Sequence, residues 1–317
     1  MILENWKQTA IEVTGKDHLA LNEVCQDRTY YVKNNGVHVI ALADGAGSRK
    51  RSEIGAMIVT KKISEFLVKN FYNVYMGLEK SGKTEAVYLE ELKTFKKFII
   101  NILVNELNNY PNVPLNELSS TLLFFAIKDD KYIVGHIGDG VIGGVFEESE
   151  TLTIETLSEP HNGGAPNITF FVTDSDAYEN LRISSGEAIN LRGVILMSDG
   201  PAEVMYHKDY GLDENVIKIF ENFERIVPDK YEQILKTFLV ERIAKFSSDD
   251  LSLNILFLES ILANNQEQYD LNLLKTIKAK TQISFKSQYC VHIDSSIKPN
   301  TRDFLTLDEL RRYLKWQ

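Results

Sequence analysis

Four short segments join an apolar run to an aspartate, and they constrain the fold of this chain more than any other feature. In three of them a glycine follows the aspartate directly, so the backbone can turn there and approach a ligand closely. Because Mg²⁺ and Mn²⁺ prefer several oxygen ligands, the set predicts carboxylates gathered around hard cations. The segments are residues 39–45 (VIALADG), 132–140 (YIVGHIGDG), 194–200 (VILMSDG) and 247–252 (SSDDLS).

Length, charge and cysteine content limit the classes of protein to consider. A chain of 317 residues suits one large domain or two small ones. Its net charge of −10 argues against nucleic-acid binding, which needs basic surfaces. Cys25 and Cys290 cannot build a disulfide framework, which favours a reducing, cytoplasmic location. No signal-peptide pattern and no apolar run of about 20 residues is present, so no association with a membrane is expected.

The hydrophobic pattern predicts hairpins and paired helices rather than a strict alternation of strand and helix. This order favours an α+β fold in which antiparallel sheets are flanked by helices. Strands are expected at residues 29–33, 37–43, 122–127, 132–137, 141–146, 167–173, 193–198 and 251–258, and the clearest helices at 52–71, 85–107 and 231–246.

The composition changes after Glu259, where the chain becomes polar and rich in Asn and Gln. Residues 305–316 (LTLDELRRYLKW) predict a terminal helix that begins with a capping box. We therefore divide the chain into a domain of residues 1–258 and a C-terminal extension of residues 259–317. The apolar residues of the extension favour packing on the domain over a disordered tether.

The aspartate segments occur in an order that resembles the metal-dependent serine/threonine phosphatases of the PPM family, also called type 2C. ALADGAGS resembles the Asp-Gly segment of that family, SSTLLFFAI its Thr-Thr strand entry and GHIGDG its Gly-Asp-Ser segment. ILMSDG resembles its Ser-Asp-Gly segment, and SSDDLSLNIL its closing Asp-Asn-x-Ser segment. The resemblance covers residues 10–258 and is closest to the bacterial branch. It implies an αββα sandwich, in which two antiparallel sheets lie face to face with a helix pair on each outer side.

The resemblance also implies a binuclear Mn²⁺ or Mg²⁺ site at one end of the sandwich. Carried over by motif, Asp44 would bridge both ions, and Gly45 would contribute its carbonyl oxygen. Asp199 and Asp249 would hold one ion. Asp139 is a candidate ligand for a third, weaker ion. Two such cations can share and activate a water for attack on phosphorus, so no protein nucleophile is needed.

Asp27 would lie behind the second ion, as a direct ligand or through water. The preceding residue, Gln26, departs from the family, which usually has a glutamate there. The phosphate-binding arginine of the family is also missing near its expected place. The candidates for contacting phosphate in its stead are Arg28, Arg49 and His18, although a surface or packing role is the simpler interpretation of the last two.

A second motif competes with this interpretation. Residues 77–84 (GLEKSGKT) match the P-loop pattern of NTPases, whose backbone cradles phosphates. A P-loop follows a buried strand, however, whereas residues 70–76 (NFYNVYM) are interrupted by polar residues and continue a predicted helix. Residues 77–84 are therefore interpreted as a loop that connects two helices, and a P-loop NTPase is the least favoured alternative.

The leading hypothesis is a metal-dependent phosphatase that acts on phosphoserine or phosphothreonine in proteins. Its partners would be phosphorylated substrate proteins, and family members of this kind often counter a cognate kinase. The alternative from another class is a catalytically weak PPM-like module that binds a phosphoprotein or another partner. Gln26 and the missing arginine motivate this alternative, whereas the retained Asp44, Asp199 and Asp249 oppose it.

Overall fold

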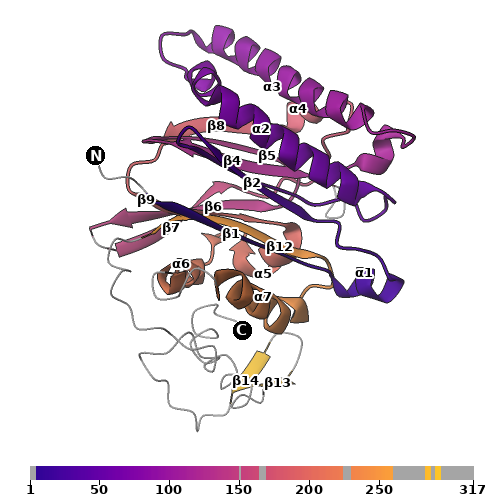
Figure 1. Cartoon of the computed structure of the whole chain (residues 1–317). Helices are drawn as coiled ribbons and strands as arrows, with labels where there is room; N and C mark the ends of the chain where they lie inside the picture. The colour runs from indigo at the N-terminus through magenta and orange to yellow at the C-terminus, as the bar shows by residue number, and fades with distance from the viewer. Residues whose placement is uncertain are drawn as a thin grey trace.

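Two antiparallel sheets of five strands each lie face to face in the computed structural model (Figure 1). The structure describes residues 5–149, 151–163, 169–223 and 230–259, together with the backbone of a small ladder formed by β13 (Ile283–Lys286) and β14 (Cys290–Ile293). In spatial order, the upper sheet of Figure 1 contains β2 (Arg28–Asn34), β3 (Val37–Ala43), β4 (Leu122–Lys128), β5 (Lys131–Ile137) and β8 (Arg182–Glu187). The lower sheet contains β1 (Trp6–Val13), β12 (Leu251–Leu258), β9 (Leu191–Met197), β6 (Val141–Glu148) and β7 (Thr151–Ser158).

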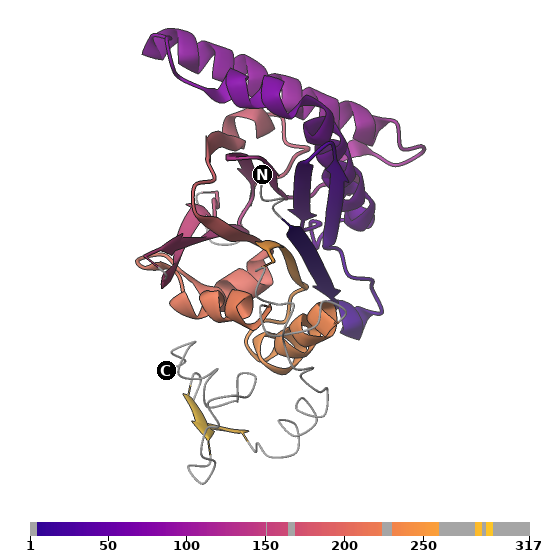
Figure 2. The same cartoon turned by 60° about the vertical axis from the view of Figure 1, so that its left-hand side comes forward.

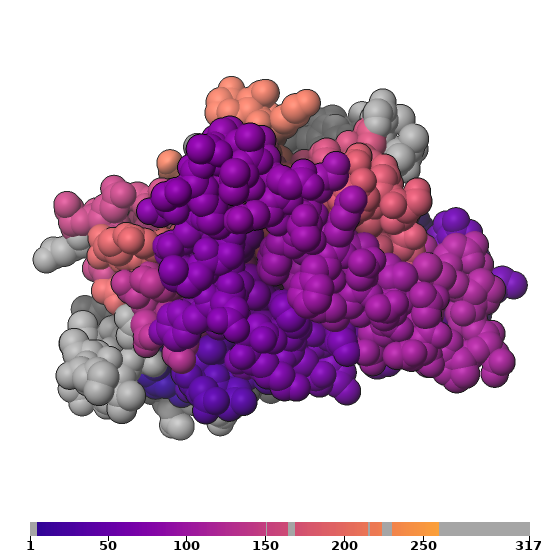
Figure 3. Space-filling model, turned by 90° about the horizontal axis from the view of Figure 1, so that it is seen from above, coloured from indigo at the N-terminus to yellow at the C-terminus, as the bar shows by residue number. Residues whose placement is uncertain are grey.

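Helices cover the outer face of each sheet (Figures 1 and 2). The long helices α2 (Ser52–Leu78) and α3 (Glu85–Asn108) lie over the upper sheet, and they form much of the surface seen from above in Figure 3. Below the lower sheet lie α5 (Asp199–Met205), α6 (Ile217–Phe223) and α7 (Tyr231–Glu241). The smaller elements are α1 (Lys16–Leu21), α4 (Ala177–Asn180), the ladder of β10 (Tyr206–His207) with β11 (Gly211–Leu212), and 3-10 turns at Leu115–Leu118, Glu214–Val216 and Ile243–Lys245.

Strand β3 shows how the sequence produces this layered arrangement. All of its residues are buried. Successive side chains of a strand point to opposite faces, and here both faces are apolar apart from His38. Ile40 and Leu42 pack between the sheets, whereas Val39, Ala41 and Ala43 pack against the layer of α2 and α3. The run, apolar except for His38, is therefore typical of a strand that is covered on both sides. The predicted αββα sandwich is confirmed.

Most predicted elements are present, and the strands that the pattern missed lie at sheet edges. The predicted strands 37–43 and 251–258 match β3 and β12 residue for residue. Strands β1, β7 and β8, which the pattern did not predict, each end the order of their sheet. An edge strand is covered less completely, so its alternation of apolar residues is weaker.

The strand predicted at residues 167–173 is wrong. Within its described part, Thr169 forms only an isolated bridge with Asn162, and the chain then turns. Its apolar character serves a different purpose, because Val172 is buried in the cluster beneath α2 and α3. The amide of Val172 donates to the carbonyl oxygen of Ser120 at 2.9 Å, so a loop satisfies it instead of a strand.

The P-loop match does not have the structure of a P-loop. Helix α2 ends at Leu78 and α3 begins at Glu85, so the motif spans a helix end and the connection to the next helix. Lys83 pairs with Glu91 on α3, with 2.9 Å between Nζ and Oε2. Because a P-loop follows a strand, this geometry contradicts the NTPase alternative.

Two further sequence predictions concern the C-terminal region and membranes. The predicted helix at residues 305–316 lies outside the described residues, and the division between residues 1–258 and 259–317 stays a prediction. Among the helices that the structure describes, none combines the length and the apolar composition that crossing a membrane requires.

Candidate metal centre

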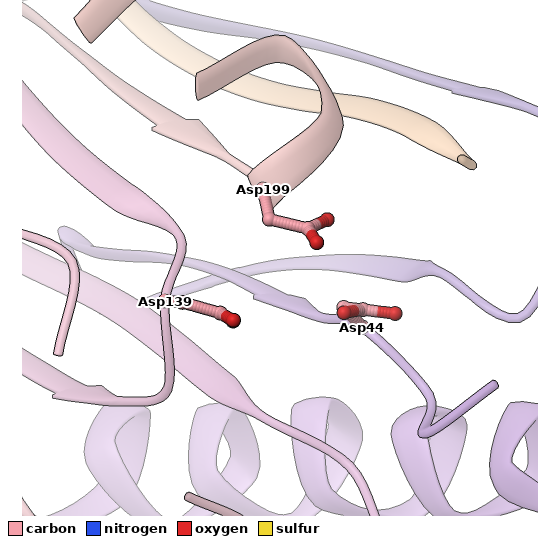
Figure 4. Close-up of side chains that lie close together, drawn as sticks. All are labelled: Asp44, Asp139 and Asp199. Carbon is pink, nitrogen blue, oxygen red and sulfur yellow. The ribbon is translucent and has the colours of Figure 1, made fainter. Parts of the chain in front are cut away.

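Three carboxylates converge at one edge of the two sheets (Figure 4). Asp44 directly follows β3, Asp139 lies in the turn between β5 and β6, and Asp199 begins α5 just after β9. One oxygen from each lies within 4.8 Å of the other two. The three residues come from both sheets, and their carboxylates point toward one another. Such a set of close oxygen ligands fits a hard divalent cation.

The backbone around Asp44 is held from two sides. The amide of Asp44 donates to the hydroxyl of Thr121 at 2.9 Å, and the amide of Thr121 donates to the carbonyl oxygen of Asp44 at 2.8 Å. Gly45 then passes so close to the first turn of α2 that an added Cβ would lie 2.8 Å from Cβ of Ser52. A glycine is therefore required for the chain to pass between the aspartate and the helix.

Electrostatics show that these carboxylates are poorly accommodated as bare anions. Burial, followed by the charges of Asp199 and Asp27, raises the pKa of Asp44 well above its usual value. Burial and then the charges of Asp249 and Asp139 raise the pKa of Asp199 in the same way. A bound cation would offset this repulsion, so the residues fit the ions that the family resemblance implies.

Asp27 is buried, and its carboxyl group lies close to that of Asp44. Its side chain is 1% exposed, and burial followed by the charge of Asp250 raises its pKa to about 7. The hydroxyls of Ser198 and Ser252 face it and partly oppose this rise. Asp27 also raises the pKa of Asp44, so its carboxylate belongs to the same electrostatic group.

The family resemblance placed Asp249 at one of the two ions and Asp139 at a weaker third ion. Asp249 is not one of the three converging carboxylates, although its charge raises the pKa of Asp199. One of its oxygens accepts the amide of Asp250 at 2.8 Å. Asp139, which the resemblance placed at a weaker third ion, is a member of the group.

Gln26 reaches the backbone beside the converging carboxylates. With its amide nitrogen turned toward these acceptors, it donates to the hydroxyl of Ser52 at 2.8 Å and to the carbonyl oxygens of Gly45 at 3.1 Å and Ala46 at 3.3 Å. The carbonyl of Gly45 therefore already has a protein donor. A carbonyl oxygen carries two lone pairs, so one lone pair stays open to a cation.

The three candidates for phosphate contacts differ in how they are already engaged. The guanidinium of Arg28 donates to the carbonyl oxygens of Cys25 at 2.6 Å and of Asp27 at 2.5 Å. His18 is buried, and its Nδ1 lies 3.0 Å from Oδ1 of Asp250. Arg49 is half-buried on the loop that leads from Asp44 into α2.

Asp250 is the residue that sequence reasoning missed. Its side chain is 2% exposed and accepts the amides of Gly15 and Gln26, each at 2.6 Å. The available signal was the tandem pair in SSDDLS, because the second aspartate stands where the resembling segment of the PPM family has an asparagine.

Solved structures of known proteins share this fold. A structure described as serine/threonine phosphatase Stp1 from Staphylococcus aureus is 16% identical, with a TM-score of 0.52, and the match covers 82% of this chain and 98% of that one. A serine-threonine phosphatase 2C from Toxoplasma gondii is 15% identical, with a TM-score of 0.55, covering 80% and 95%. The serine/threonine phosphatase of S. agalactiae is 15% identical, with a TM-score of 0.51, covering 80% and 100%. At these identities the matches show a shared fold.

The sequence comparisons settle the family. No curated protein sequence matches the chain. Residues 14–240, by contrast, match the family model described as Protein phosphatase 2C. This match spans most of both sheets, α2, α3 and all three converging aspartates. The chain therefore belongs to the protein phosphatase 2C family of serine/threonine phosphatases.

Proposed function

We propose that this chain hydrolyses phosphoserine and phosphothreonine in proteins with the help of two Mn²⁺ or Mg²⁺ ions, and that a weaker third ion can bind. The convergence of Asp44, Asp139 and Asp199 carries the proposal. Their raised pKa values support it, because buried carboxylates this close together call for positive charge. The family supports phosphoproteins as the class of substrate.

Each carboxylate has a role in this proposal. Asp44 would hold both ions, Asp199 and Asp249 would hold one of them, and Asp139 lies close enough to Asp199 to contribute a ligand as well. Asp27 and the carbonyl oxygen of Gly45 serve the second ion. Bound divalent cations would supply a water of lowered pKa, oriented toward phosphorus.

Arg49 is the best of the three candidates for holding the substrate phosphate. A guanidinium binds phosphate through two parallel hydrogen bonds. Arg28 already donates to two backbone carbonyls, and His18 is paired with Asp250. Arg49 follows the Asp44–Gly45 turn on the same loop, and its side chain is half-buried there.

The proposal also names the kind of enzyme that opposes this phosphatase and the compartment in which it acts. We infer that a kinase acting on the same substrate proteins is the functional counterpart of this phosphatase. A cytoplasmic location is supported by the content of only two cysteines.

Hydrolysis of a phosphothreonine peptide, followed as released phosphate with and without Mn²⁺, tests the proposal. We expect Mn²⁺-dependent turnover in the wild-type chain and a loss of at least about 100-fold in Asp44→Asn, because metal ligation stabilises transition-state charge by several kcal/mol. Lys83→Ala is the matched control, because Lys83 lies in the connection between α2 and α3 and should retain full activity.

The same assay distinguishes the alternative function. A wild-type chain that binds the phosphopeptide but releases no phosphate at saturating Mn²⁺ would contradict the proposal. That result would select the catalytically weak module, for which Gln26 in the place of a glutamate is the motivating residue.

A further inference from the structure

Asp250 holds two distant points of the chain with one carboxylate. Oδ1 accepts the amide of Gly15 at 2.6 Å, and Oδ2 accepts the amide of Gln26, also at 2.6 Å. Nδ1 of His18 lies 3.0 Å from Oδ1. Gly15 and Gln26 bracket α1 and the link from α1 to β2, so both ends of this segment are tied to the residue that precedes β12.

The backbone contacts around Asp250 are close. A Cβ added to Gly15 would lie 2.3 Å from the carbonyl carbon of Asp249, so the two backbones touch there. The amide of Asp17 donates to the carbonyl oxygen of Ser248 at 3.2 Å, and the hydroxyl of Ser248 donates to Asp17 at 2.7 Å. The segment that contains α1 is therefore joined to residues 247–250 along its first turn.

The arrangement satisfies a buried charge. An unpaired carboxylate at 2% exposure would be strongly destabilising, whereas two amide donors and a neighbouring histidine compensate for its lost hydration. Burial alone would lower the pKa of His18, but the nearby carboxylates of Asp250, Asp249 and Glu23 outweigh burial and raise it. His18 therefore offers Asp250 a complementary charge when its ring is protonated.

We propose that Asp250 and His18 act as positioning residues, and we call the two side chains with the Gly15 and Gln26 amides the Asp250 clamp. The clamp fixes the backbone of Gln26, whose side chain reaches the carbonyl of Gly45 and whose neighbour is Asp27. It thereby positions Asp27 and the carbonyl oxygen of Gly45, which are proposed to serve the second ion, without providing a ligand itself. Its effect on metal affinity rests on the proposed function, whereas the clamp itself is tested without metal.

The clamp requires an aspartate. Two carboxylate oxygens accept two amides on opposite sides, whereas an asparagine offers one oxygen, and its NH₂ group would face the second amide donor. His18 lies near the loop after Asp44, with Nε2 4.0 Å from the position of a Cβ on Gly47. The histidine therefore lies beside the loop that carries Arg49.

Amide hydrogen exchange of the metal-free protein, resolved by NMR, tests the clamp directly. We expect Asp250→Asn to reduce the protection of Gly15 or Gln26, or of both, by at least about 10-fold, which corresponds to losing one charge-assisted hydrogen bond. The protection of β9 and β6 should not change. Ser248→Ala is the matched control, because it removes a neighbouring exposed hydrogen bond to the same segment and should leave the Gln26 amide protected.

Calorimetric titration with Mn²⁺ provides the second measurement. A residue that orients ligands from behind typically contributes 10–100-fold to metal affinity, so Asp250→Asn should weaken Mn²⁺ binding by about 10-fold. Wild-type protein that binds no Mn²⁺ would contradict the proposed function and leave the exchange test of the clamp intact. Unchanged protection of both amides in Asp250→Asn would overturn the clamp whatever the metal does.

His18→Gln covers the case in which Asp250→Asn does not fold. Removing the imidazole while keeping a polar side chain should increase exchange at Gly15 and Gln26 by about 3-fold, as expected when an interaction of somewhat under 1 kcal/mol is lost. If protection at both amides stays at the wild-type level, His18 has no part in the clamp and the proposal is wrong for that residue.

Discussion

The burial of Asp44 among other carboxylates suits a bound cation but disfavours its charged form when no cation is present. Its position after a strand that is buried on both faces brings it next to Asp199 and Asp27, which suits a shared cation. The same burial and the same neighbours raise its pKa when no cation is present. The metal-free protein therefore loses stability at the residue that is proposed to hold both ions.

This conflict predicts a pH dependence for Asp44→Asn. A carboxyl group with a raised pKa in the folded state favours folding below its unfolded pKa of about 4, and this contribution is lost as pH rises toward the folded value. Asparagine has no such dependence. In the metal-free protein we expect Asp44→Asn to be more stable than the wild type, by a margin that grows from pH 5 to pH 8 in urea unfolding.

Buried histidines do not obscure the comparison of these two proteins. His38 and His136 have lowered pKa values because they are buried, and they make the fold less stable at acidic pH. Their contribution is common to both proteins and cancels in the difference. A stability difference that stays constant across this pH range would mean that Asp44 is not perturbed as described.

Helix α2 illustrates what the sequence shows at the scale of an element. Its apolar spacing predicted a helix over residues 52–71, and the structure extends it to Leu78. What the spacing could not show is how tightly each end packs. A Cβ on Gly55 would lie 1.9 Å from the carbonyl oxygen of Leu118, whereas a Cβ on Gly77 would have no neighbour within 4 Å.

These two glycines form a matched pair of variants. Gly55→Ala should lower the free energy of unfolding by about 2–3 kcal/mol, because the backbone beside Leu118 must move. Gly77→Ala should raise it by about 0.5 kcal/mol, because alanine favours a helix over glycine and meets no obstacle. Chemical denaturation of both variants checks the pair. Equal effects would mean that α2 does not pack on Leu118 as closely as described.

At the scale of the whole molecule, the candidate metal centre connects the two layers of the sandwich. Asp44 and Asp139 follow strands of the upper sheet, whereas Asp199 follows β9 of the lower sheet. A cation held by all three therefore binds only when both sheets are folded and in register, and it should stabilise the entire domain.

Thermal denaturation tests this connection. At a free Mn²⁺ concentration 100 times the dissociation constant, the wild-type chain should gain about 2.7 kcal/mol, and its Tm should rise by roughly 5–10 °C. Asp199→Asn and Asp139→Asn should both lose most of this rise. A full rise of the Tm in Asp139→Asn would mean that Asp139 serves only a weaker third ion, as the family resemblance implied.

The site residues that the sequence predicts are recognised from features of their immediate neighbours in the chain. Asp44 and Asp199 were identified because each follows an apolar strand and precedes a glycine, which places it at a sheet edge wherever that sheet lies. Asp250 carried no such signal. A buried carboxylate is recognised by its partners, and Gly15, His18 and Gln26 are more than 200 positions away in the chain.

The sequence alone determined that this chain forms strands covered on both faces, joined by hairpins and flanked by long helices, with aspartates at the strand ends. These features depend on the spacing of apolar residues and on turn chemistry, which act over a few positions. Only the tertiary structure decided that Asp139 joins Asp44 and Asp199 and that Asp250 ties α1 to β12. Distances between remote residues follow from how the sheets pack and register, and no local pattern contains that information.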